Sequence, residues 1–162
     1  MSVLHFHIAG PVQGKARPRA TIRNGRPHIY TPTKTEKYEH RLAQHAQIAM
    51  RGRPPYEGPL ELHVEVGCEC PKSWSKAKRA RALLGFIRPT VKPDASNIAK
   101  AIEDAMNKIV YEDDVQIVDL RVKKYYTERP FVTVTVCPTF NPLQAKDPAC
   151  SSSITQQSLS TT

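Results

Sequence analysis

The chain has 162 residues and a mass of 18.2 kDa; 40% of its residues are apolar and 24% are charged, which suits one globular domain and leaves no room for a second. No run approaches the roughly 18 consecutive apolar residues of a membrane helix, and the N-terminus lacks the basic and apolar segments of a secretion signal. These features argue against membrane and secreted proteins. The four cysteines have no CxxC spacing, so we interpret them as reduced thiols of a cytoplasmic protein.

The first half of the chain predicts a strand, a hairpin arm and a helix. Residues 3–9 alternate in the manner of a strand, which ends at Gly10-Pro11. After a basic loop we expect a β-hairpin over residues 21–30, because Asn24-Gly25 is typical of a two-residue hairpin turn. Residues 31–50 predict a helix with one apolar and one charged side.

The second half predicts three more strands and an amphipathic helix. The strands are expected at residues 60–70, 115–125 and 131–137. The helix is expected over residues 96–109, where apolar residues recur with helical spacing. Between them, residues 71–85 predict a short basic helix or excursion outside the core, with Trp74 as its aromatic anchor.

Together these elements predict a single α+β domain over residues 1–140. Its mixed β-sheet would be covered by two main helices and would carry basic loops. Residues 141–162 are rich in Ser, Thr, Gln and Pro and have almost no apolar periodicity, so we expect a disordered C-terminal tail.

Charge is distributed unevenly along the chain, whose formal net charge is +9. Residues 14–53 contain ten basic residues and two acidic ones, and residues 72–88 contain six basic residues and no acidic one. Residues 94–119 reverse the sign, with seven acidic residues against two basic ones. Such a pattern is expected when carboxylates bind divalent cations and the basic surface binds a polyanion; a solvated acidic helix face paired with basic neighbours is the alternative.

The acidic residues of this segment lie at both ends of the second predicted helix. Asp94 precedes the helix, whereas Asp113 and Asp114 follow it. A helix of about 15 residues is some 22 Å long, so these carboxylates can meet only if the flanking strands or the helix tilt bring them to a common cleft. Otherwise Asp94 is a helix N-cap, and Asp113 and Asp114 are turn residues.

The segment KPDASNIAKAIEDAMNKIVYEDDVQIVDLRVKKYY resembles the signature of the RusA family of Holliday junction resolvases, in which KPDxDN opens a helix and DD-x-Q-I/V follows it. The stretches YTPTKTEKYE and PKSWSK also resemble phage-type members, so the resemblance covers about residues 3 to 137. It implies Mg²⁺-dependent phosphodiester hydrolysis, with Mn²⁺ as an alternative ion. It also implies a homodimer that acts on four-way or branched DNA, of bacterial, phage or prophage origin, without a small-molecule cofactor.

The resemblance assigns roles to individual residues. Asp94 matches the first motif aspartate and Lys100 the motif lysine, while Asp113 and Asp114 match the paired aspartates. We therefore expect Asp94, Lys100 and Asp114 to be catalytic, and Asp94, Asp113 and Asp114 to hold the metal. Lys100 would stabilise charge on the phosphoryl oxygens; a pair with Asp104 on an exposed helix face is the alternative.

One position departs from the family motif. Ser96 stands where the second aspartate is usual, and a hydroxyl is a weak ligand for Mg²⁺. Three outcomes are open: a lower metal affinity, compensation by Asp113, Asp104 or Glu103, or an impaired member. The last defines the alternative function, a junction- or branched-DNA-binding protein that does not cut.

The basic segments supply candidate DNA contacts, for which solvated basic surface is the alternative. The expected DNA-binding residues are Lys15, Arg17, Arg19, Lys76, Lys78 and Arg79. Tyr30, Tyr38 and Trp74 are more readily interpreted as packing residues than as stacking platforms for bases. His5, His7, His40, His45 and His63 lack zinc-ligand spacing with cysteines, so we interpret them as structural.

Overall fold

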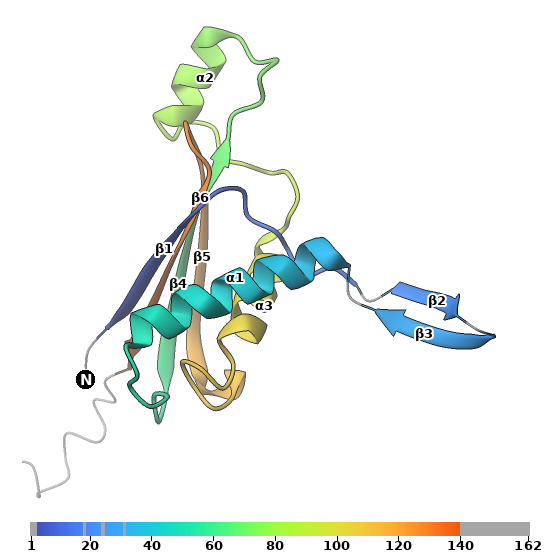
Figure 1. Cartoon of the computed structure of the whole chain (residues 1–162). Coiled ribbons are helices and arrows are strands. Elements are labelled where there is room, and N and C mark those ends of the chain that lie inside the picture. The colour runs from blue at the N-terminus through green and yellow to red at the C-terminus, as the bar shows by residue number, and fades with distance from the viewer. Residues whose placement is uncertain (1–2, 18, 24, 31, 140–162) are drawn as a thin grey trace, which may run out of the picture.

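The computed structural model describes residues 3–17, 19–23, 25–30 and 32–139, so the predicted tail at 141–162 lies outside the described residues. Figure 1 shows the arrangement of the elements. In chain order they are β1 (Leu4–Ala9), β2 (Arg19–Arg23), β3 (Arg26–Tyr30), α1 (Thr33–Met50), β4 (Leu60–Glu69), α2 (Lys76–Leu83), α3 (Ala95–Met106), the 3₁₀ turn η1 (Asp114–Gln116), β5 (Ile117–Thr127) and β6 (Phe131–Pro138).

Four strands form one mixed sheet in the order β1-β6-β4-β5 (Figure 1). β6 pairs antiparallel with both β1 and β4, whereas β4 pairs parallel with β5. A parallel pair needs a crossover connection, and here the crossover is the segment that contains α2 and α3. The prediction of an α+β domain with a mixed sheet is confirmed.

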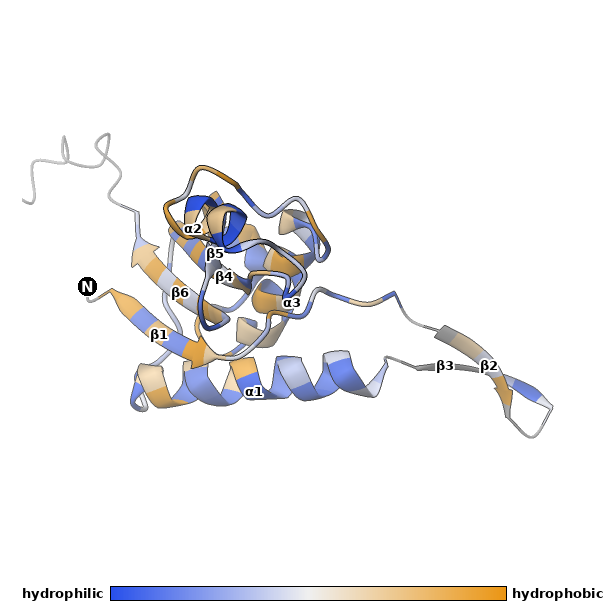
Figure 2. Ribbon diagram, turned by 90° about the horizontal axis from the view of Figure 1, so that it is seen from above, coloured by the Kyte–Doolittle hydropathy of each residue, from blue (hydrophilic) through white to orange (hydrophobic). Residues whose placement is uncertain are grey.

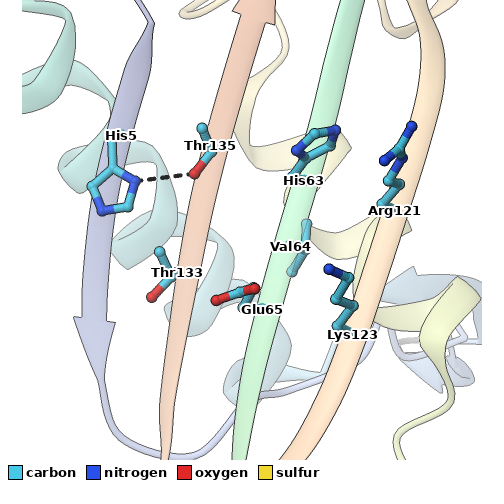
Figure 3. Close-up of a pocket in the computed structure, with 8 residues that line it drawn as sticks. All are labelled: His5, His63, Val64, Glu65, Arg121, Lys123, Thr133 and Thr135. Atoms are coloured by element: carbon cyan, nitrogen blue, oxygen red, sulfur yellow. Dashed lines mark hydrogen bonds between the residues drawn. The ribbon is translucent and has the colours of Figure 1, made fainter.

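The helices α1 and α3 cover one face of this sheet, as predicted (Figure 2). Alternate apolar residues of the strands point into the interface between sheet and helices, where the most deeply buried include Leu62, Val64, Val66, Val134 and Val136. The opposite face carries the other residues of each strand, which are mostly polar, and no described helix lies over it (Figure 3). Within the described part of the chain, no helix is long and apolar enough to cross a bilayer.

The strands β2 and β3 form a separate hairpin that projects away from the sheet and its helices (Figures 1 and 2). Arg23 lies opposite Arg26, which leaves a two-residue connection, as the Asn24-Gly25 pair predicts. Gly25 has a φ of +72°, a conformation that favours glycine. The hairpin prediction is confirmed, with its first strand beginning two residues earlier than expected.

The end of the second main helix differs from the prediction. The periodicity predicts a helix that continues to Ile109, but α3 ends at Met106. Lys108 has a φ of +63°, which an α-helix does not contain, so the chain turns there. This turn sends the following acidic residues back along the helix.

The excursion between β4 and α3 is mostly exposed, as predicted, but it is not detached from the sheet. Ala82 of α2 is buried against Cys70 and Tyr126 in a second, small apolar cluster. Trp74 packs on Tyr126 with ring centroids 5.0 Å apart. Packing roles are thereby confirmed for Trp74 and for Tyr38, a residue of α1 that is buried in the apolar core; the side chain of Tyr30 lies outside the described residues.

Candidate active site

The predicted metal ligands lie at two places along α3. Asp94 is the N-cap residue of α3, and its side chain makes no capping hydrogen bond. Asp113 and Asp114 lie beyond the other end of the helix, where Asp113 caps η1 through a hydrogen bond from Val115 N to its Oδ1 (3.3 Å). Asp104, near the C-terminal end of α3, follows Asp94 by ten positions, or about 15 Å along the helix axis.

The turn places the paired aspartates beside the C-terminal half of α3. The hydrogen bond that Asp113 and Asp114 share lowers the pKa of Asp113 and raises the pKa of Asp114. The charge of Asp104 adds to the rise at Asp114. Burial, followed by the charges of Asp114 and Asp104, raises the pKa of Glu103. We call Glu103, Asp104, Asp113 and Asp114 the acid centre. Neighbouring carboxylates repel the charges of Glu103 and Asp114, and a bound cation would relieve that repulsion.

Lys100 of α3 is a positively charged side chain that acts on two carboxyl groups of the acid centre. Its charge lowers the pKa of both Glu103 and Asp114, against the other contributions. The side chain is exposed, and Asp104 pairs with Lys15 instead of with Lys100. Asp94 is not among the groups that shift the pKa of Asp114 or Glu103. The structure thus brings Lys100 and Asp114 together and leaves Asp94 at the far end of the helix.

Lys15 joins three elements at the acid centre. Its Nζ lies 2.7 Å from Glu39 Oε1 of α1 and 2.8 Å from Asp104 Oδ2 of α3. Burial works against the charge of Lys15, but the hydrogen bonds to Asp104 and Glu39 outweigh it and raise the pKa. Its predicted contact with DNA therefore competes with an ion pair inside the protein.

The loop that carries Lys15 is docked closely on the start of α3. Lys15 N donates to Asn97 O (2.9 Å). A Cβ at Gly14 would lie 2.8 Å from Cβ of Pro93, so only glycine allows this approach. Beside the loop, a groove of about 750 Å³ is lined by Arg17, Lys92 and Asp94 among others. Asp94 thus lies in a groove with basic walls.

Lys124 of β5 fixes the segment that leads into Asp94. Its Nζ donates to Val91 O (2.6 Å) and to Pro93 O (2.8 Å). Ser96 follows in the first turn of α3 and is exposed. The position that departs from the family motif therefore lies with Asp94, away from the acid centre.

Gln116 holds the acidic turn in place, and the residue-by-residue prediction missed it. Its Oε1 accepts hydrogen bonds from Glu112 N (2.9 Å) and Asp113 N (3.2 Å). Its Nε2 donates to Tyr56 O (2.9 Å) and Gly58 O (3.0 Å). In the sequence, the Q of the DD-x-Q motif was the signal that pointed to this residue. Gln116 joins the acidic turn to the connector before β4, and we call its four hydrogen bonds the clamp.

The predicted DNA-binding residues are spread over three regions. Arg17 is exposed in the docked loop, and Arg19 begins the hairpin arm, with a side chain outside the described residues. The α2 residues are Lys76, Lys78 and Arg79. Lys78 Nζ lies 4.2 Å from the ring centroid of Trp74. The predicted DNA-binding residues therefore belong to separate elements: the docked loop, the hairpin arm and α2.

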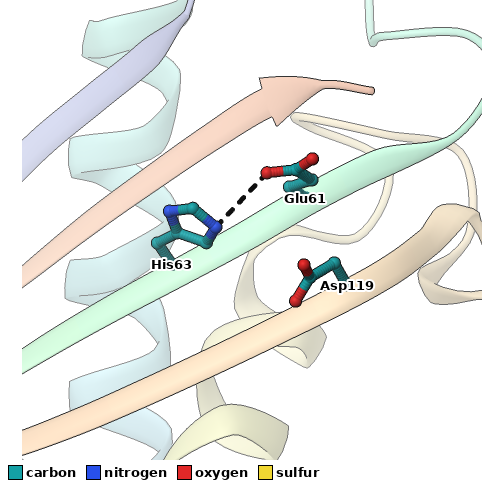
Figure 4. A group of neighbouring side chains, drawn as sticks. All are labelled: Glu61, His63 and Asp119. Atoms are coloured by element: carbon teal, nitrogen blue, oxygen red, sulfur yellow. Dashed lines mark ion pairs between the residues drawn. The ribbon is translucent and has the colours of Figure 1, made fainter. Parts of the chain in front are cut away.

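A second group of ligand-type side chains lies on the open face of the sheet. Glu61 and His63 of β4 and Asp119 of β5 each offer one ligand atom, and these atoms lie within 4.8 Å of one another (Figure 4). From the sequence, His63 is expected to be structural, because no cysteine has zinc-ligand spacing to it. Period-two alternation places Glu61 and His63 on one face, but Asp119 joins them only through the pairing of β4 with β5.

A family model described as endodeoxyribonuclease RusA matches residues 9–137, which include the acid centre, Lys100 and Asp94. The chain belongs to the RusA endodeoxyribonuclease family. A similar protein from Bacillus subtilis (strain 168), "Uncharacterized protein YqaN", is 39% identical over 140 residues, which make up 84% of this chain and 96% of that protein. The resemblance deduced from the sequence is thereby confirmed, and the family match gives no support to the alternative of a non-cutting DNA-binding protein.

The repulsion in the acid centre predicts a pH-dependent effect of Asp114→Asn on stability. The hydrogen bond between Asp113 and Asp114 shifts their two pKa values in opposite directions, whereas burial and the charges of Asp113 and Asp104 further raise the pKa of Asp114. A carboxyl group whose pKa is raised in this way destabilises the folded state once it ionises, so the penalty is absent below the ordinary pKa and complete above the raised one. Without divalent ions, the variant should melt at a higher temperature than the wild type at pH 7, and this difference should shrink towards pH 4. Thermal unfolding at both pH values measures it; an equal or lower melting temperature at pH 7 would contradict the repulsion.

The clamp predicts that Gln116→Ala weakens the fold around the acidic turn. The variant loses four hydrogen bonds, and we expect a loss of about 1–3 kcal/mol in the free energy of unfolding. Gln44→Ala, on the exposed side of α1, is the matched control and should change stability by less than about 0.5 kcal/mol. Urea denaturation measures the free energy of unfolding of both variants. Equal values would show that the hydrogen bonds of Gln116 do not stabilise the fold.

Proposed function

We propose that the protein is a structure-selective endodeoxyribonuclease that resolves four-way DNA junctions by Mg²⁺-dependent phosphodiester hydrolysis. The observation that carries this proposal is the family match across the residues that form the acid centre. The unequal charge distribution supports it, since a segment rich in carboxylates belongs to a chain whose net charge is +9.

The donor chemistry of the acid centre fits Mg²⁺. Its side chains offer only carboxylate oxygens, the ligands that Mg²⁺ prefers together with retained water. The hydrogen bond with Asp113 raises the pKa of Asp114 most, and burial raises the pKa of Glu103 most; neighbouring negative charge adds to both shifts, and a divalent ion would offset that charge. We propose Asp113 and Asp114 as ligands, with Asp104 compensating for Ser96. When bound, the ion supplies a Lewis acid that polarises the scissile phosphate and lowers the pKa of a coordinated water.

The other residues of the site bind and orient the DNA. Lys100 is placed to stabilise the charge that develops on the phosphoryl oxygens. Arg17 and Lys92 line the groove beside Asp94 and suit the phosphates of a junction arm. Asp94 is proposed as a ligand that completes the site from the N-terminus of α3, which requires either bridging water or movement of α3 when DNA binds. Lys15 and Gln116 act as positioning residues, because they hold Asp104 and the acidic turn.

A homodimer is the assembly that this proposal requires. Two symmetrical cuts across a junction need two active sites related by a two-fold axis. We propose that each chain contributes one acid centre and that the α2 residues Lys76, Lys78 and Arg79 bind a second arm of the junction.

The test is cleavage of an end-labelled four-way junction in Mg²⁺ and, separately, in Mn²⁺. The wild type should introduce paired nicks, while Asp114→Asn should abolish them and Lys100→Met should slow them by about 10²-fold or more. Glu128→Gln is the matched control, because Glu128 is an exposed carboxylate in the turn before β6, and it should cut as the wild type does.

Ser96→Asp separates the proposed enzyme from the alternative. If Asp104 compensates, the variant should cut no more than a few times faster than the wild type. A wild type that binds the junction in a salt-dependent manner but does not cut it in either ion, together with a Ser96→Asp variant that does, would contradict the proposal and identify a non-cutting DNA-binding protein.

A further inference from the structure

The open face of the sheet brings ligand-type side chains of three strands together. Glu61 lies opposite Asp119 in the parallel β4–β5 pair and opposite Cys137 in the antiparallel β4–β6 pair. In an antiparallel pair such as β4–β6, directly opposed residues have Cβ atoms about 4.5–5.5 Å apart. Two residues along β4, His63 points to the same face (Figure 4). Glu61 therefore has a second carboxylate and an imidazole close by, with their ligand atoms within 4.8 Å of one another, and the thiol of Cys137 on the neighbouring strand.

The ring nitrogen of His63 that faces this group lacks a hydrogen bond. Its Nε2 lies 3.4 Å from Oε2 of Glu61, is hidden from solvent and has no hydrogen-bond partner in the described part of the chain. Buried polar atoms are satisfied in almost all native structures, and an exception calls for a missing partner such as an ion. A metal ion between His63, Glu61 and Asp119 would supply that partner.

The surroundings orient the carboxylate of Asp119 and leave it able to bind an ion. Arg121 donates from Nε to Oδ1 (3.3 Å) and from Nη2 to Oδ2 (2.9 Å) of Asp119. A carboxylate has about four lone-pair positions, so Arg121 leaves two of them for a metal. Outer partners of this kind fix the orientation of metal ligands in known sites. Beside them, a solvent-open hollow of about 260 Å³ lined by His63, Arg121 and Thr135 gives an ion access (Figure 3).

We propose that Glu61, His63 and Asp119 form a zinc site on the open face of the sheet, with Cys137 as the fourth ligand. Zinc takes nitrogen, sulfur and carboxylate donors in tetrahedral sites, whereas Mg²⁺ is bound through oxygen alone. The thiol of Cys137 is half-buried and free of disulfides. Four protein ligands make a closed, structural site, which would fasten β4 to β5 and β6. The site shares no residue with the acid centre and does not depend on the proposed nuclease function.

The test is zinc binding by the full-length protein after treatment with a chelator, measured by isothermal titration calorimetry. The wild type should bind one zinc ion per chain, and Asp114→Asn should bind it equally well. His63→Gln and Asp119→Asn should weaken binding at least 10- to 100-fold, since even loss of an outer-shell partner costs that much. Glu65→Gln, the next outward-facing residue of β4, is the matched control and should retain wild-type affinity.

Cobalt substitution tests the fourth ligand. Co²⁺ in place of zinc should give the visible spectrum of a tetrahedral site and a near-ultraviolet thiolate band, and Cys137→Ser should remove the thiolate band. Melting curves of the metal-free variants establish that each one folds. A wild type that binds no zinc, or a folded His63→Gln variant that binds it as tightly as Glu65→Gln, would overturn the site; a thiolate band that persists in Cys137→Ser would overturn the role of Cys137.

Discussion

Mutual repulsion among the carboxyl groups beside the C-terminal half of α3 is the constraint that the surrounding structure has to offset. Asp113 and Asp114 are neighbours in sequence, and the turn after α3 brings them to Glu103 and Asp104. Gln116 fixes this turn through four hydrogen bonds. If the acid centre is the proposed ion site, this crowding of like charges is stability given up for function, as is common at enzyme active sites.

Packing in the apolar core positions the acid centre, chiefly through Tyr111. Tyr111 is fully buried, and its hydroxyl donates to Glu103 O (3.0 Å). Burial, with smaller contributions from Glu103, Asp114 and Asp104, raises the pKa of this phenol, so it stays protonated and remains a donor. Lys108 N donates to the carbonyl of Tyr111 (2.8 Å), which closes the turn after α3. The apolar core and the acid centre are therefore connected through one aromatic residue.

The sheet separates two groups of side chains that suit different metal ions. On the helix-covered side, the acid centre offers only carboxylate oxygens, which suit a hard ion that keeps part of its water. On the open side, Glu61, His63 and Asp119 offer nitrogen and oxygen within 4.8 Å of one another, a tighter geometry that suits a borderline ion. The more compact of the two groups is thus not the one that the family match associates with nuclease activity.

Local patterns in the sequence predicted the elements of the fold well. Period-two alternation located β1, β4 and β6, and the Asn24-Gly25 pair located the hairpin. The end of α3 could not be predicted in the same way, because Ile109 continues the apolar stripe and the turn at Lys108 depends on packing around Tyr111.

The candidate site was predictable only in part, because its geometry depends on non-local contacts. The motif predicts roles for Asp94, Lys100 and Asp114, but the ion pair of Lys15 with Asp104 joins segments far apart in the chain. Asp119 meets His63 only through strand register. Such contacts have no signal in a single sequence.

The central claim is that the catalytic ion binds at the acid centre, and paramagnetic broadening of amide resonances by Mn²⁺ tests it most directly. In the full-length protein at substoichiometric Mn²⁺, we expect the strongest broadening at residues 103–104 and 112–115 and none at α2, with the effect lost in Asp114→Asn. Broadening that is centred elsewhere, or that persists unchanged in Asp114→Asn, would contradict the account.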